Sequence, residues 1–230
     1  FNLKNKIFLY KSANKYRVQA CKNYNANISF TVAEKAFDEV KDAEKQGYKF
    51  VHPFDGPHTL QGSATLGLEI IDQINDMDTK IDNVLISVGG GGLISGVGAV
   101  LKQIFPNINI IGIEPDEAKG ITDSLKSNQP LQKVYINSIA DSLCAPIHMP
   151  YSFSIAKQVI DEMFNITDKD MSEAMLFAYN QLKLFLEPAC VAGFAALKKF
   201  QNKNFKGQNT LILLCGSNID FQSWNSIVNH

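Results

Sequence analysis

Short apolar runs rich in β-branched and aromatic residues alternate along this chain with longer stretches in which apolar residues recur at helical spacing. In the first quarter, this pattern predicts strands at residues 7–10, 27–30 and 48–52, and helices at residues 13–24 and 31–46. Strand–helix alternation at these lengths is typical of βαβ units, which build parallel sheets.

Pro53 and the segment Asp55-Gly56-Pro57 interrupt this alternation. So many prolines and glycines indicate a loop, and we expect the crossover between two domains here. The alternation then resumes, with predicted helices at 63–74, 93–105, 151–163, 168–186 and 189–202, and predicted strands at 84–88, 108–113 and 210–214. Thr167 and Asp170 have the types and spacing of a helix start. The predicted fold class is therefore α/β with a doubly wound parallel sheet.

Charge and composition exclude several classes of protein. The 22 Lys and Arg residues nearly balance the 23 Asp and Glu residues, which gives no electrostatic reason to bind nucleic acid or an anionic membrane. No apolar run reaches the roughly 18 residues of a membrane-spanning helix. The four cysteines form no Cys-x-x-Cys pair for zinc or redox chemistry, so we expect buried thiols in a reducing compartment. These features predict a soluble, cytoplasmic protein.

The sharpest feature is a run of four glycines, residues 89–92, between a predicted strand and a predicted helix. A tight turn that needs positive φ would explain one or two glycines. Four are better explained by backbone amides that converge on a phosphate, helped by the positive end of the following helix. A dinucleotide fingerprint fits poorly, although Glu114 stands at a suitable distance, because its third glycine would fall on Ser95 or Ile94. A P-loop and a serine nucleophile elbow are missing as well, so we predict a small monophosphate ligand.

Several motifs in a fixed order resemble the threonine/serine dehydratases, which are fold-type-II pyridoxal phosphate (PLP) enzymes of the tryptophan-synthase-β-like superfamily and have serine racemase among their relatives. Besides the glycine run, the segments that carry this resemblance are 51–55, 61–70, 114–115, 139–141, 186–189 and 215–220. They extend over nearly the whole chain. The ordered set is much more specific than any one motif.

The resemblance implies a set of cofactor-binding residues. The PLP phosphate would be bound by the loop of Gly89, Gly90, Gly91, Gly92 and Leu93. Cys215 would face the pyridine nitrogen, although by itself it reads as a small buried thiol that ends a core strand. Glu187 matches a glutamate near the ring, or is an ordinary carboxylate at a helix end. Phe54 is expected near the cofactor without an assigned role, and His52 in loop hydrogen bonds.

Some members of this family carry a divalent cation, and the resemblance implies Glu114 and the carbonyl of Ala118 as two of its ligands. The third ligand, an aspartate, is replaced here by Gly120. Asp123 would have to substitute for it. A cation is thus only a possible second cofactor.

The lysine to which the family attaches PLP lies in a Ser-x-Lys-x-Arg-Gly motif, and neither this motif nor the Ser-Gly-Asn-His loop that follows it occurs in this sequence. We therefore expect no catalytic residue in this chain. Residues 1–50 would be the remnant of a small α/β domain, and residues 51–230 the large PLP-binding domain, of a longer enzyme. The chain ends ten residues after Asp220, before any regulatory domain, which favours a catabolic or serine-racemase-like branch.

The resemblance implies an ammonia-lyase that deaminates L-threonine or L-serine by β-elimination to a 2-oxo acid and ammonia. Two alternatives stay open: a serine-racemase-like racemase or lyase, and a non-catalytic module that binds PLP or phosphate. The expected partner is a small amino-acid substrate rather than nucleic acid or membrane. The resemblance also implies a homo-oligomer, a dimer or a tetramer.

Overall fold

A computed structural model describes residues 3–11, 13–77 and 79–229, without the side chains of residues 33, 34 and 201–204. The chain folds into two compact units. The first unit extends to Val51 and includes the segment Asn218–Ser223, and the second contains the remainder from His52 onward.

The first unit contains one small parallel sheet. Strand β1 (Ile7–Tyr10) pairs with β2 (Ile28–Thr31), and helix α1 (Lys15–Asn23) connects them; α2 (Ala33–Lys45) follows. Gly47 ends α2 with a φ of +88°, a conformation that glycine adopts without strain. The strand predicted at residues 48–52 is wrong, because this segment has no neighbouring strand in the described structure and Val51 is 78% exposed. A β-favouring sequence forms a strand only where a partner satisfies its backbone.

The second unit contains a four-stranded sheet in the order β5-β4-β3-β6, and every pair is parallel. Its strands are β3 (Asn83–Ser87), β4 (Asn109–Pro115), β5 (Glu162–Ile166) and β6 (Thr210–Ile212). Parallel strands need crossover connections, and these place helices on both faces of the sheet. The doubly wound α/β fold predicted from the sequence is thus confirmed.

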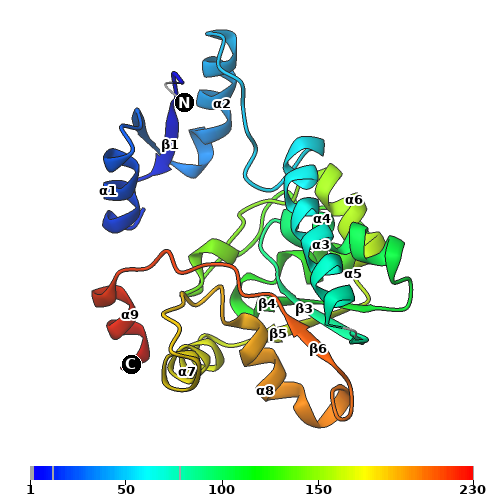
Figure 1. Cartoon of the computed structure of the whole chain (residues 1–230). Helices are drawn as coiled ribbons and strands as arrows, with labels where there is room; N and C mark the ends of the chain where they lie inside the picture. Colours follow the sequence, from blue (N-terminus) through cyan, green and yellow to red (C-terminus); the bar gives the residue numbers. More distant parts are fainter. Residues whose placement is uncertain (1–2, 12, 78, 230) are drawn as a thin grey trace. The chain divides into compact units, whose positions relative to one another are not determined.

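One group of helices packs around α4 (Gly92–Ile104), which contacts β3, α3 (Pro57–Asp76) and α6 (Pro150–Val159) (Figure 1). The other group contains α8 (Ala192–Asn204), which contacts β3, β4 and β5, and α7 (Asp168–Phe177), which packs on α8. Two shorter helices complete the chain, α5 (Gly120–Ser127) and α9 (Phe221–Val228).

Several predicted boundaries need correction. Helix α3 begins at Pro57, six residues before the predicted start, because proline at the first helical position requires no amide partner. The helix predicted at 151–163 ends at Val159, and the edge strand β5 follows, which the sequence analysis missed. The helix predicted at 168–186 ends at Phe177 and continues as one π-helical turn. The predicted start is confirmed, since Thr167 and Asp170 form a reciprocal capping box.

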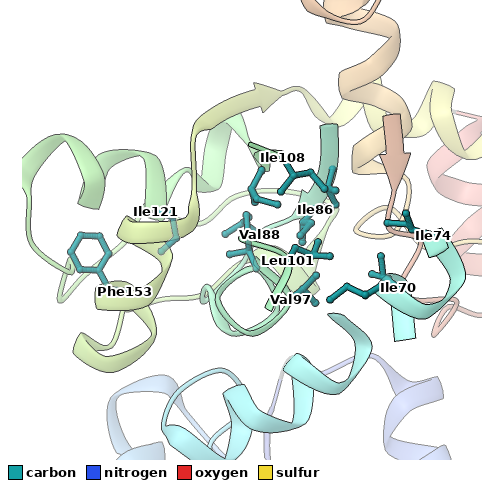
Figure 2. Close-up of a cluster of buried hydrophobic side chains, with 13 residues drawn as sticks. Ile70, Ile74, Ile86, Val88, Val97, Leu101, Ile108, Ile121 and Phe153 are labelled. Atoms are coloured by element: carbon teal, nitrogen blue, oxygen red, sulfur yellow. The ribbon is translucent and has the colours of Figure 1, made fainter. Parts of the chain in front are cut away.

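A buried apolar cluster lies between the sheet and the helix group around α4 (Figure 2). It brings together Ile70 and Ile74 of α3, Ile86 of β3, and Val97 and Leu101 of α4. This cluster fixes α4 against β3, and so fixes the segment that connects them.

Candidate active site

The glycine run forms the turn between β3 and α4, at the carboxyl end of the strand. Gly91 is the N-cap of α4, with a φ of +89° that L side chains rarely adopt. A Cβ on Gly90 would lie 2.1 Å from the ring of Phe54, and one on Gly92 would lie 2.6 Å from the carbonyl oxygen of Phe54. Three of the four positions therefore require glycine, either for φ or for close contact with the segment around Phe54.

The carbonyl groups of this loop point into the protein. Ser63 Oγ donates a hydrogen bond to the Gly92 carbonyl at 3.0 Å, and Ser152 Oγ donates one to the Gly90 carbonyl at 3.4 Å. The Gly91 carbonyl accepts the amide of Ser95. Over the described residues, the amides of residues 89–93 have no backbone carbonyl as a partner. The loop and the first turn of α4 thus present a row of free N–H donors, as an anion-binding helix N-terminus does.

The predicted ring-binding cysteine lies at the same edge of the sheet. Because β6 is the parallel neighbour of β3, with Leu85 opposite Ile212, the residues that follow both strands leave the sheet together. Cys215 comes three residues after β6 and is exposed. The expectation of four buried thiols is therefore wrong, since only Cys190 is buried among them. Cys215 lies beyond the end of β6, so the helices that cover the sheet do not bury its side chain.

Glu187 lies beside Cys215. A Cβ on Gly216 would lie 2.2 Å from Oε1 of Glu187, and Gly216 has a φ of +137°. The Glu187 side chain is buried, 6% exposed, in the segment between the π-helical turn and α8. Ser87 Oγ donates to the carbonyl of Ala189 at 2.8 Å and ties this segment to the end of β3. The structure thus brings Glu187 and Cys215 together, next to the strand that carries the glycine loop.

Cys190, one of the four cysteines expected to be buried, is a neighbour of this pair. Its thiol is buried, and burial raises its pKa to about 12, with the nearby Cys215 and Glu187 adding to the effect. Such a thiol is chemically inert. No sequence pattern indicates this contact, because Cys190 and Cys215 come from different elements.

The residues implied as cation ligands do not fit a cation. Glu114 is fully buried at the end of β4, and its carboxylate accepts hydrogen bonds from the amides of Ile121 and Thr122 and from Thr122 Oγ1, at 2.8 to 2.9 Å. Burial raises the Glu114 pKa to about 7 against these bonds. Among the described residues, no three His, Cys, Asp or Glu side chains come together as a metal site. The Glu114 carboxylate therefore already accepts hydrogen bonds from the first amides of α5, in the position where a bound cation would need its oxygens.

His52 and Phe54 lie in the loop next to the glycine run, and the expected loop hydrogen bond of His52 is confirmed. Phe54 N donates to His52 Nδ1 at 3.3 Å, so His52 serves the hydrogen bonding of its own loop. Burial lowers the pKa of His52. The ring of Phe54 lies against Gly90, in the wall of the glycine loop.

This loop fits the phosphate of PLP. The carbonyls of Gly90, Gly91 and Gly92 accept hydrogen bonds from within the protein, while the amides of residues 89–93 have no backbone partner in the described part of the chain. Side chains at Gly90 and Gly92 would collide with Phe54. The family described as "Pyridoxal-phosphate dependent enzyme" matches residues 1–216 of this chain. The chain belongs to this family. Members of this family depend on PLP, and the glycine loop of this chain is suited to bind the PLP phosphate.

Known proteins agree with this assignment. A phenylserine dehydratase of Ralstonia pickettii is 36% identical over 217 residues, which cover 94% of this chain and 65% of that protein. The processed form of threonine deaminase isoform 2 from Solanum lycopersicum superposes with a TM-score of 0.87 at 28% identity, covering 97% of this chain and 65% of that one. Maize serine racemase superposes with a TM-score of 0.84 at 27% identity, covering 98% and 69%. The chain thus spans slightly less than two thirds of the phenylserine dehydratase and of the threonine deaminase.

None of the described helices is long and apolar enough to span a bilayer.

Proposed function

We propose that the protein containing this chain deaminates a β-hydroxy-α-amino acid, L-threonine or L-serine, to a 2-oxo acid and ammonia with PLP as cofactor. The observation that carries this proposal is the glycine loop, whose free amides and bonded carbonyls suit a phosphate monoester at the carboxyl end of β3. The dehydratase and deaminase names of the similar proteins support the reaction type.

In this proposal the chain's residues bind and orient the cofactor. The amides of Gly89, Gly90, Gly91, Gly92 and Leu93 hold the phosphate at the N-terminus of α4. When bound, PLP withdraws electrons from Cα of the amino acid, so that the α-proton and the β-hydroxyl can leave. In the net reaction the amino acid loses water, takes up water again and releases ammonia.

Cys215 and Glu187 would lie at the ring. A cysteine facing the pyridine nitrogen, in place of a carboxylate, leaves this nitrogen without the negative partner that would hold a proton on it, which favours elimination over a long-lived carbanion. Glu187 lies over Gly216, the residue that follows Cys215. The lysine that holds the cofactor covalently would come from outside residues 1–230.

The test is an assay of the purified full-length protein with L-threonine, L-serine and phenylserine, measuring 2-oxo acid and ammonia in equal amounts. Cys215→Asp would place a carboxylate at the ring nitrogen, and we expect kcat to fall by at least about tenfold while PLP stays bound. Cys21→Ser, at a partly buried cysteine of α1 in the first unit, serves as the control. PLP binding without 2-oxo acid from any of the three substrates would contradict the proposal.

A racemase is the second candidate, favoured by the similarity to maize serine racemase. Chiral chromatography of the same L-serine reaction distinguishes it, because a racemase forms D-serine and a dehydratase does not. A protein that binds PLP and forms neither product would be a non-catalytic module.

We also propose that the unit ending at Val51 belongs to a small domain and the unit from His52 onward to the large PLP-binding domain. The charge balance and the metabolic relatives support a cytoplasmic protein, with a small-molecule substrate and neither nucleic acid nor membrane as a partner. The family resemblance supports a homo-oligomer, which the molecular mass in solution would test.

A further inference from the structure

His148 is a buried imidazole that the proposed function does not use. It lies in the segment before α6, its side chain is 1% exposed, and Nδ1 has no hydrogen-bond partner among the described residues. The ring forms a hydrogen bond with the backbone of Gly90, the second glycine of the phosphate loop. Because Nδ1 is without a partner among the described residues, we assign this bond to Nε2.

The same nitrogen lies against the start of α5. A Cβ on Gly120 would lie 2.2 Å from His148 Nε2, so any side chain at position 120 would collide with the imidazole. The family resemblance implies an aspartate at position 120 in members that carry a cation. In this chain the ring fills that space, and the amide of His148 donates to the carbonyl of Leu131 at 2.8 Å, which holds the ring in place.

On the other side of the α5 start, Glu114 receives the amides of Ile121 and Thr122. The carboxylate therefore binds α5 to β4, while the imidazole lies between α5 and the phosphate loop. Glu114 and His148 together connect three elements that a metal ion could otherwise link.

We propose that His148 is a positioning residue for the phosphate loop, held in the space of the missing third cation ligand, and that this protein holds its cofactor phosphate without a divalent cation. By fixing the Gly90 carbonyl, the imidazole turns the next amides of the loop toward the phosphate. This inference rests on the proposed binding of PLP at the loop.

The first experiment measures the dissociation constants of PLP and of pyridoxal, which lacks the phosphate, in the full-length protein. His148→Leu removes the donor, and we expect the Kd for PLP to rise about tenfold while that for pyridoxal stays the same. His148→Gln keeps an N–H at similar reach and should restore most of the affinity. Met171→Leu, at a fully buried residue of α7, is the control for a disturbed core.

An equal loss of affinity for both ligands in His148→Leu, or no loss for either, would overturn the positioning role. If the wild-type protein bound neither ligand, the proposed function itself would fail, and this outcome is distinct from a failure of the His148 inference.

The second experiment compares EDTA with Mg²⁺ and with Ca²⁺. We expect the Tm and the PLP affinity of the wild-type protein to be the same in all three, and lower affinity in EDTA would overturn the inference. The double variant Gly120→Asp with His148→Ala provides a carboxylate and removes the ring, and we expect its Tm to rise when a cation is added. No cation effect on the double variant would show that the imidazole does not close this position, which would also overturn the inference.

Discussion

Cys190 and Cys215 show how the environment of one residue decides its chemistry. Both come from the same neighbourhood, but Cys215 is exposed while Cys190 is buried with a pKa raised to about 12. Alkylation requires an accessible thiolate. The two cysteines should therefore differ strongly in reactivity.

We predict that iodoacetamide at pH 8 modifies Cys215 at least about a hundredfold faster than Cys190. Bound PLP should slow the reaction at Cys215 and leave that at the partly buried Cys21 unchanged, because only Cys215 is proposed to face the ring. Peptide mass spectrometry over a time course measures the rates. If PLP slowed the reactions at Cys215 and Cys21 equally, this result would argue against Cys215 as a ring contact.

His148 should contribute to acid denaturation. Burial lowers its pKa from 6.5 to about 4, so the unfolded protein binds a proton more readily than the folded one across this range. Stability is therefore complete above pH 6.5 and is lost as pH falls, by about 3 kcal/mol at pH 4 and below. We expect His148→Leu to lose less stability than the wild type between these pH values, as measured by urea denaturation. Parallel pH curves for the two proteins would contradict this assignment.

At the scale of elements, the glycine loop depends on its contact with the segment before α3. Gly90 and Gly92 both face Phe54, and Gly91 sets the direction of the chain into α4 with its positive φ. The loop is therefore shaped by packing as much as by the ligand.

We predict that Gly90→Ala weakens PLP binding by at least about tenfold, since the added methyl group would displace either the loop or the Phe54 ring. Phe54→Ala in the same chain should recover part of the affinity by vacating that space. Gly62→Ala, where a Cβ meets nothing within 4 Å, is the matched control. Fluorescence titration with PLP measures all four proteins. A double variant as weak as Gly90→Ala alone would mean that Phe54 is not the obstacle.

At the scale of the whole molecule, the chain divides between two compact units near Val51. The segment from Gly47 to His52 forms no helix or strand, and Val51 is largely exposed. Exposed backbone without regular structure is the preferred substrate of proteases.

We therefore predict that limited digestion with chymotrypsin cuts first after Tyr48 or Phe50. Helices α3 and α4 should stay intact for longer, because their facing residues are buried in the core of the second unit. Mass spectrometry of the first products identifies the bonds. First cuts within residues 57–104 would contradict the division into units.

The sequence by itself determined the elements with strong local signals: the α/β alternation, the helix start at Thr167, and the turn of four glycines. These depend on side-chain periodicity and on φ angles that few residues tolerate, so they are local properties. The family motifs indicated which residues to expect as cofactor ligands, among them Cys215 and Glu187.

Only the tertiary structure decided the features that depend on a partner far along the chain. Residues 48–52 form no strand because no described strand lies beside them. Residues Glu162–Ile166 form a strand because β4 lies beside them and pairs with their backbone. His148 meets Gly90 and Gly120, and Glu187 meets Gly216, across separations that no pattern reveals. Burial and contact are properties of the packed chain, so the pKa values of Cys190, Glu114 and His148 could not be predicted from residue type.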